Sequence, residues 1–203
     1  MKFRSPLLVL YFALAIQSGL AQNTYVPDDN FEQALIDLGY DDVLDDYVLT
    51  ENISGVTSLN VNNKEISDLT GIAGFTALTD LKCDDNQLTS LDVSSNVALI
   101  SLQCRNNQLT SLDMSNNTAL STLICYNNSL TSLDVSNNTA LTGLECHTNQ
   151  LTSLDLSANT ALTLLHSDGN PLTSLDVSAN TSLTILSCNN NQLTSLDVSN
   201  NTA

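Results

Sequence analysis

The chain has 203 residues, a formal net charge of −17, an aromatic content of 4% and no Trp. Its 22 acidic residues far outnumber its 5 basic residues, which makes a polyanion such as DNA or RNA a poor partner. The scarcity of large rings also argues against a compact core built around aromatic side chains.

Residues 1–21 have the three parts of a signal peptide. Lys2 and Arg4 supply a positive start, an apolar run at 6–16 is too short to span a membrane comfortably, and small residues precede a cleavage site after Ala21. An uncleaved anchor is the alternative. We expect cleavage, export and a mature chain without a transmembrane span.

Residues 22–52 are expected to form a helical N-terminal cap. Asp29 can N-cap a helix, and Glu32, three residues later, completes a capping box. Gly39 is a typical C-terminal stop. The helix would cover the open end of the following segment with one apolar face, formed by Phe31, Ala34, Leu35 and Leu38.

The segment 53–203 is periodic. It contains one degenerate unit near Val56 and six units of 21 residues, which begin at Leu78, Leu99, Leu120, Leu141, Leu162 and Leu183. Each unit holds two copies of one template, in which alternating inward residues predict a short strand and a following Asn predicts a turn. A single unit cannot bury its leucines, so units must stack. The sequence therefore predicts a mainly β solenoid of short parallel strands and turns.

These repeats resemble the short 21-residue nested class of leucine-rich repeats in secreted bacterial proteins, which read LxxLxCxxNxLxxLDVSxNxA. The stretch NISGVTSLNVNNKEISDLTGIAGFTALTDL is similar to the repeats of internalins, and YVPDDNFEQALIDLGYDD resembles the cap that precedes such repeats. The resemblance implies a leucine-rich repeat solenoid that binds another macromolecule at or beyond the cell surface. It does not name the ligand, because this fold serves many roles.

One cysteine recurs at the same inward position of the units, at Cys83, Cys104, Cys125, Cys146 and Cys188, and Ser167 fills the remaining unit. Export favours disulfides, but side chains that point in parallel into a core have poor disulfide geometry, and the count is odd. A metal cluster would need recurring His or C-x-x-C spacing, which these positions lack. We therefore predict free, buried thiols that act as small hydrophobic residues.

One carboxylate points outward in the second half of each unit, at Asp92, Asp113, Asp134, Asp155, Asp176 and Asp197. Three interpretations stay open. The carboxylates can accept hydrogen bonds from the nearby turn or from Ser94 and its equivalents, repel one another and so raise their pKa values, or hold calcium between units. The sequence predicts no cofactor, with calcium as the open possibility.

The units differ mainly at the outward positions of their first half, whereas the second half repeats Ser and Asp in every full unit. Tyr and Arg at such positions are typical binding anchors. The predicted ligand-binding residues are Lys82, Arg105, Ile124, Tyr126, Glu145, His147, His166 and Asp168. Neutral drift is the alternative, although the equally exposed second half does not vary.

Stacking in register would place Glu145 beside His166 and His147 beside Asp168. Such pairs could bind a metal or transfer a proton. An open sheet face, however, has no enclosed pocket that excludes water, and no nucleophile is positioned by a partner. We therefore predict that the protein is not an enzyme and assign neither catalytic residues nor metal ligands.

The predicted function is an exported module, secreted or at the cell surface, that recognises a protein or a surface glycan through the variable positions. A calcium-dependent structural or adhesive spacer within a larger surface protein is the alternative. The last unit ends on a repeat boundary with nothing after it to cover its leucines, so we expect the native chain to continue.

Overall fold

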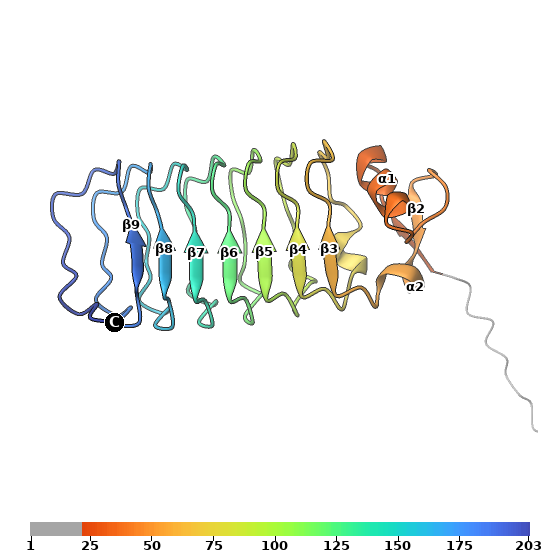
Figure 1. The fold of residues 1–203 in the computed structure, drawn as a ribbon. Coiled ribbons are helices and arrows are strands. Elements are labelled where there is room, and N and C mark those ends of the chain that lie inside the picture. Colours follow the sequence, from red (N-terminus) through yellow and green to blue (C-terminus); the bar gives the residue numbers. More distant parts are fainter. Residues whose placement is uncertain (1–21) are drawn as a thin grey trace, which may run out of the picture.

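The computed structural model describes residues 22–203 as a solenoid with one long parallel sheet (Figure 1). Seven three-residue strands follow each other in chain order in this sheet. They are β3 (Ser58–Asn60), β4 (Asp80–Lys82), β5 (Ser101–Gln103), β6 (Thr122–Ile124), β7 (Gly143–Glu145), β8 (Leu164–His166) and β9 (Ile185–Ser187). The central leucines pair in register, from Leu59 opposite Leu81 to Leu165 opposite Leu186. The predicted fold class is confirmed.

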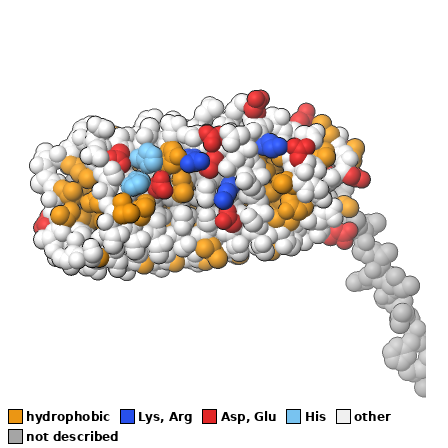
Figure 2. Space-filling view, in the orientation of Figure 1, with side chains coloured by type: hydrophobic (Ala, Val, Ile, Leu, Met, Phe, Trp, Pro, Cys, Tyr) orange, Lys and Arg blue, Asp and Glu red, His pale blue; other side chains and the backbone are white. Residues whose placement is uncertain are grey.

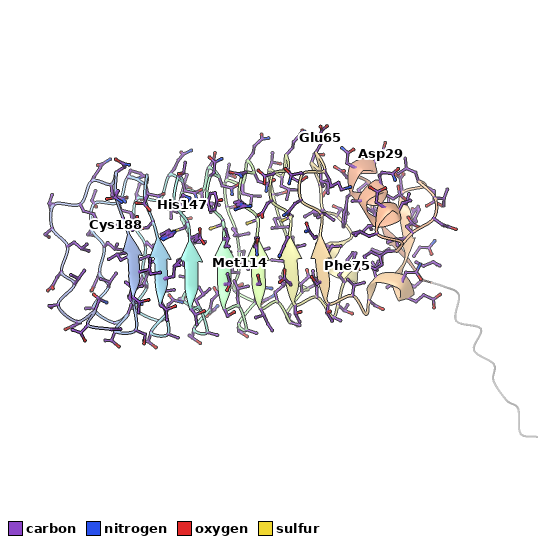
Figure 3. The ribbon with its side chains drawn as sticks, in the orientation of Figure 1. Asp29, Glu65, Phe75, Met114, His147 and Cys188 are labelled. Atoms are coloured by element: carbon purple, nitrogen blue, oxygen red, sulfur yellow. The ribbon has the colours of Figure 1, made fainter. Side chains whose placement is uncertain are left out.

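The core is a set of ladders, because each repeat position lies above its equivalent in the next unit. In the first full unit Leu78, Leu81, Cys83 and Leu88 are completely buried, and the same pattern recurs along the chain. Met114 is equally buried where the other full units carry Val or Leu (Figure 3). Alternation within the strand leaves the residues beside each central leucine on the outer face of the sheet.

The second half of each unit is not a strand within residues 22–203, which corrects the prediction of a strand in each half. Its inward residues Leu91 and Val93 are buried as expected. The backbones of neighbouring units are joined there by single hydrogen bonds, such as the one that Gln108 N donates to Leu88 O at 2.8 Å. The alternating pattern therefore predicted correctly which side chains face inward. The backbones of neighbouring units, however, do not pair as β-strands there.

Asparagine side chains provide much of the remaining connection between units. The Asn107 amide donates to Cys83 O at 3.0 Å and to Cys104 O at 3.1 Å, while its Oδ1 accepts from Leu88 N at 3.0 Å. The equivalent asparagines repeat this arrangement in the following units. Each Asn therefore satisfies backbone groups of two successive units at the turn, as its recurrence predicted.

The N-terminal elements cover the β3 end of the solenoid (Figure 1). Strand β1 (Asn23–Tyr25) pairs antiparallel with β2 (Tyr47–Leu49), and the helices are α1 (Asp29–Asp37), α2 (Thr50–Ile53) and the 3-10 turn η1 (Ile72–Gly74). Phe31 and Phe75 are completely buried with their ring centroids 6.4 Å apart. The apolar face of α1 thus packs against the first repeats.

The predicted capping box is wrong. The N-cap of α1 is Asp28, whose Oδ1 accepts from the backbone amides of Asn30 and Phe31. Glu32 is buried and its Oε1 accepts from Asp45 N and Tyr47 N, each at 3.0 Å. The carboxylate that fits the capping spacing is thus used to fix the loop before β2.

Two further cap residues were predicted from the helical pattern. Gly39 follows the helix with φ of 79°, the left-handed conformation expected of a C-terminal stop. Leu38 was expected on the buried face but is 46% exposed. It is the C-cap residue, where the helical periodicity ends and no longer directs the side chain towards the core.

The predicted signal peptide, 1–21, lies outside the described residues. Within 22–203 no helix is both long enough and apolar enough to cross a membrane. At the other end of the described chain, Leu196 and Val198 are 39% and 47% exposed, whereas their equivalents Leu175 and Val177 are buried beneath a following unit.

Candidate functional site

The predicted ligand-binding residues all lie on or directly after the strands of the parallel sheet, and we call them the variable face. They are Lys82, Arg105, Ile124, Tyr126, Glu145, His147, His166 and Asp168. In Figure 2 histidine, lysine and arginine side chains gather on the face that Figure 1 shows to carry the strands. Ile124 pairs with Glu145 and Glu145 pairs with His166, so three successive strands place their last outward residues side by side.

Arg105, Tyr126 and His147 form a continuous stack on successive units. The Arg105 Nη1 donates to the Tyr126 hydroxyl at 2.7 Å, and the guanidinium carbon lies 5.5 Å from the centre of the Tyr126 ring. The Tyr126 and His147 rings are stacked, with centroids 4.0 Å apart and an interplanar angle of 19°. Three flexible side chains thereby hold one another in a defined orientation, which lowers the entropy that a ligand would have to remove.

Asp84 holds the first member of this stack, Arg105, in place. It is buried, its Oδ1 accepts from Arg105 N at 3.1 Å, and its Oδ2 lies 3.3 Å from Arg105 Nε in an ion pair without hydrogen-bond geometry. Burial raises the pKa of Asp84, and the positive charge of Arg105 opposes that rise. Asp84 was not among the predicted binding residues, although it occupies the same repeat position as Arg105 one unit earlier.

Glu145, His147 and His166 form a second group beside the stack. One ligand atom from each of the three lies within 4.8 Å of the other two, and His166 Nδ1 is 3.8 Å from Glu145 Oε2. The His147 and His166 rings meet edge to face with centroids 6.2 Å apart. Burial lowers the pKa of His147, while Glu145 and Asp168 act in the opposite direction.

The outer members of the variable face lie apart from this centre. Asp168 turns to the next unit, where Ser187 Oγ donates to its Oδ1 at 2.6 Å and Asn189 N donates at 2.9 Å. No hydrogen bond among the described residues joins it to His147. Lys82 lies two strands before Ile124, and its positive charge opposes the rise in the pKa of Asp84. The structure thus concentrates the predicted set around Tyr126, Glu145 and His147.

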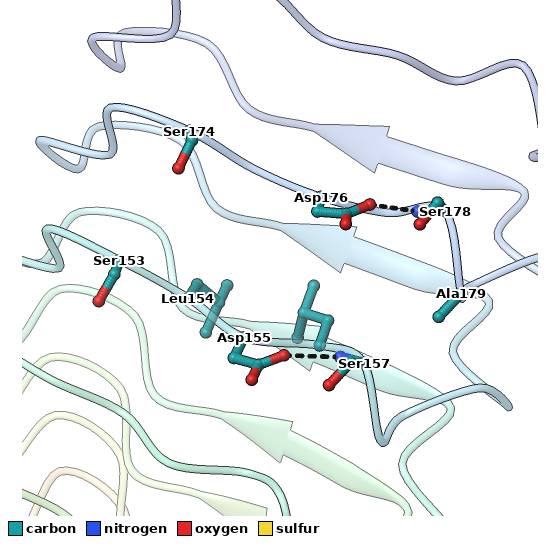
Figure 4. A pocket seen from close by; sticks show the side chains of 9 residues that line it. Ser153, Leu154, Asp155, Ser157, Ser174, Asp176, Ser178 and Ala179 are labelled. Carbon is teal, nitrogen blue, oxygen red and sulfur yellow. Dashed lines mark hydrogen bonds between the residues drawn. The ribbon is translucent and has the colours of Figure 1, made fainter.

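The second half of the units presents a regular surface instead. Serines and aspartates line shallow grooves between units, one of which has a volume of about 270 Å³ between Ser153, Asp155, Ser174 and Asp176 (Figure 4). Asp155 and its equivalents each accept a hydrogen bond at 2.9 Å from the backbone amide two residues later.

These hydrogen bonds favour the first of the three interpretations of the aspartate column over the second. Bonds from Ser94 lower the pKa of Asp92, and those from Ser157 do the same for Asp155. The pKa shifts down along the whole column, so mutual repulsion does not dominate. Calcium binding between units stays a prediction.

The five cysteines are all free thiols, as predicted. The first four are buried, and Cys188, near the end of the described chain, is half-buried (Figure 3). Burial raises the pKa of Cys146 to about 12, and it raises the pKa of Cys188 as well. The ladder is therefore a packing element, and its four buried thiols are expected to be unreactive in the folded protein.

The chain is a leucine-rich repeat solenoid, and its repeats are internalin-like, with a 21-residue period. It is 43% identical over 74 residues to internalin J of Listeria monocytogenes serotype 4b (strain F2365). The aligned residues cover 36% of this chain and 8% of that protein. No protein-family model matches the chain.

Solved structures agree with this assignment. The functional domain of InlJ from Listeria monocytogenes, described as including a cysteine ladder, is 33% identical with a TM-score of 0.50, over 90% of this chain and 51% of that one. Internalin C2 from the same species is 22% identical with a TM-score of 0.64, over 89% and 93% of the two chains. A leucine-rich repeat protein of Leptospira interrogans is 23% identical with a TM-score of 0.67, over 72% and 40%. The chain thus spans only part of internalin J and about half of the InlJ domain.

Proposed function

We propose that the protein is an exported recognition module that binds a protein or a surface glycan through the variable face. The observation that carries the proposal is the ordered stack of Arg105, Tyr126 and His147 in the middle of that face. Arg and aromatic side chains contribute most of the binding energy at interfaces, especially when they are pre-organised. Ile124 adds apolar area beside them.

The contrast between the two exposed surfaces supports this choice. The second half repeats Ser and Asp in every full unit, and its carboxylates are already engaged by their own turns. The variable face instead brings a cation, aromatic rings and an apolar side chain into one contiguous area. Similarity to internalin structures fits a binding role, because a concave repeat surface is what such solenoids offer to partners.

The test begins with the identification of a ligand for the purified protein on a glycan array and in a display library of secreted and surface proteins. Tyr126→Ala and Arg105→Ala should each then weaken capture by about 1–3 kcal/mol, because each removes an anchor. Affinity is measured by calorimetry or surface plasmon resonance, with far-UV circular dichroism to show that the fold is kept.

Ser132→Ala and Ser153→Ala are the matched controls, because both serines are exposed on the repeated half. They should leave the affinity unchanged. Equal losses on both surfaces, or losses confined to the serine variants, would show that the variable positions are drift. A melting temperature that rises with added calcium would instead favour the spacer.

A further inference from the structure

We propose that Glu145, His147 and His166 form a site for one divalent transition-metal ion of the zinc type. This site lies on the variable face but does not depend on any macromolecular ligand. From the sequence, the pairs of Glu145 with His166 and of His147 with Asp168 could bind a metal, but no metal ligands were assigned because an open sheet face has no enclosed pocket. The structure brings three ligating side chains together rather than two separate pairs.

The backbone places the three side chains on one surface. Glu145 is the last residue of β7, and His147 is two residues later, so alternation directs both outward. His166 is the register partner of Glu145 on β8. The ladder continues past the strand ends, with Cys146 N donating to His166 O at 2.8 Å and Thr148 N donating to Asp168 O at 2.7 Å. The ligand-bearing backbones are therefore held rigidly at neighbouring positions.

The distances suit a single small cation after modest rotamer changes. One ligand atom of each residue already lies within 4.8 Å of the other two. Tetrahedral zinc needs its ligands at about 2.0–2.2 Å from the ion, so the three groups must close by roughly an ångström or more. All three side chains are only partly buried, which leaves room for that adjustment.

The His147 ring provides a second, independent observation. Its Nδ1 is shielded from solvent and has no hydrogen-bond partner among the described residues. A buried polar nitrogen without a partner is costly, and its usual partners are a hydrogen-bonding group or a metal ion. The Tyr126 ring stacks on His147, so the closing movement would fall mainly on the side chains of Glu145 and His166.

The donor set determines the class of ion. Two imidazoles and one carboxylate are typical zinc ligands, whereas calcium and magnesium prefer oxygen ligands alone. Glu145 supplies negative charge, and the formal net charge of −17 favours the approach of a cation. Three protein ligands leave at least one coordination position open to solvent or to a donor atom of a partner.

The direct test is calorimetric titration of the chelator-treated protein with Zn²⁺, in the absence of any other ligand. We expect one ion per chain, with Ca²⁺ unable to compete, and an increase in melting temperature with Zn²⁺ concentration, because an ion that binds only the folded state stabilises it. His147→Asn and His166→Ser should each lower the affinity for Zn²⁺ at least about tenfold, since even the loss of an outer-sphere partner costs that much.

These variants use residues that the chain already accommodates at the same repeat positions, namely Asn189 and Ser187, so they should fold normally. Cys188→Ala and Asp155→Asn are the controls, because a half-buried thiol or the aspartate column could also attract zinc. Both should retain the affinity of the parent protein. Absence of stoichiometric Zn²⁺ binding, unchanged affinity in both histidine variants, or loss of binding in either control would overturn the proposal.

Discussion

Thr148 occupies a repeat position whose backbone has a positive φ in the full units. The residue before the turn asparagine, which is Asn107 in the second full unit, adopts a left-handed conformation in every full unit. Its φ lies between 52° and 61° from Asp85 to Asn190. Asp, Asn and Gly tolerate this region, whereas a β-branched residue there is an outlier. Asn106 and Asn127 also extend a side-chain ladder, in which Asn127 Nδ2 donates to Asn106 Oδ1 at 2.7 Å. Thr148 is the next position of that ladder.

We predict that Thr148→Asn stabilises the protein by about 1 kcal/mol, through relief of the strained φ and extension of the ladder. Urea unfolding monitored by circular dichroism measures the change. Thr152→Asn is the matched control, because Thr152 is also exposed but has no positive φ. A gain of equal size at both positions would indicate a general effect of Asn rather than relief of strain.

At the scale of elements, the sequence predicted the strands of the sheet and their register, because a 21-residue period with fixed leucines allows only one stacking. It failed where the outcome depends on contacts between distant residues. Glu32 matched the capping spacing after Asp29, yet its carboxylate is used by the backbone of Asp45 and Tyr47. Likewise the alternation around Leu91 was correct for burial but could not show that neighbouring backbones do not pair there.

In the candidate site too, the repeat pattern predicted the strand register but not the contacts between side chains. Register alone predicted that Glu145 and His166 are neighbours, and the strand pair confirms it. The stack of Tyr126 on His147 and the support of Arg105 by Asp84 depend on rotamers, which a repeat pattern does not encode. The variation among the repeats therefore indicated a candidate site, while the structure was needed to show which of its side chains lie in contact.

The cysteine ladder makes a prediction at the level of one structural element. Iodoacetamide should modify Cys188 in the native protein, because its thiol is half-buried, and should modify the other four cysteines only after unfolding. Burial raises the pKa of those thiols, to about 12 for Cys146, so little reactive thiolate exists at neutral pH. Mass spectrometry with and without urea identifies the modified residues.

Ser167 occupies the cysteine position in one unit and is completely buried there, so this position belongs to the packed core even where the residue is not a cysteine. Rapid labelling of Cys104 or Cys125 in native protein, at a rate similar to Cys188, would show that the ladder opens to solvent and does not behave as a packed core.

At the scale of the whole molecule, the aspartate column links stability to pH along the full length of the solenoid. Hydrogen bonds hold the pKa of each column member below its ordinary value of 3.8, from Asp92 to Asp197. A carboxyl group whose pKa is lowered by folding stabilises the native state above its unfolded pKa and loses that contribution as the pH falls through the folded pKa. Asp84 and Asp41 act in the opposite sense, because their pKa values are raised, but they are two groups against six.

We therefore predict that the melting temperature changes little between pH 7 and about pH 5. It should decrease at pH values below about 4, because there these carboxyl groups take up protons in the unfolded chain before they do so in the folded chain. Scanning calorimetry across this range measures the effect. The triple variant Asp134→Asn, Asp155→Asn and Asp176→Asn should show a shallower fall, since an amide oxygen can still accept the bond from the turn but does not titrate. A melting temperature that instead rises as the pH is lowered to about 3.5 would mean that repulsion between stacked carboxylates outweighs their hydrogen bonds. In that case the grooves between Asp155 and Asp176 would become the place to look for a bound cation.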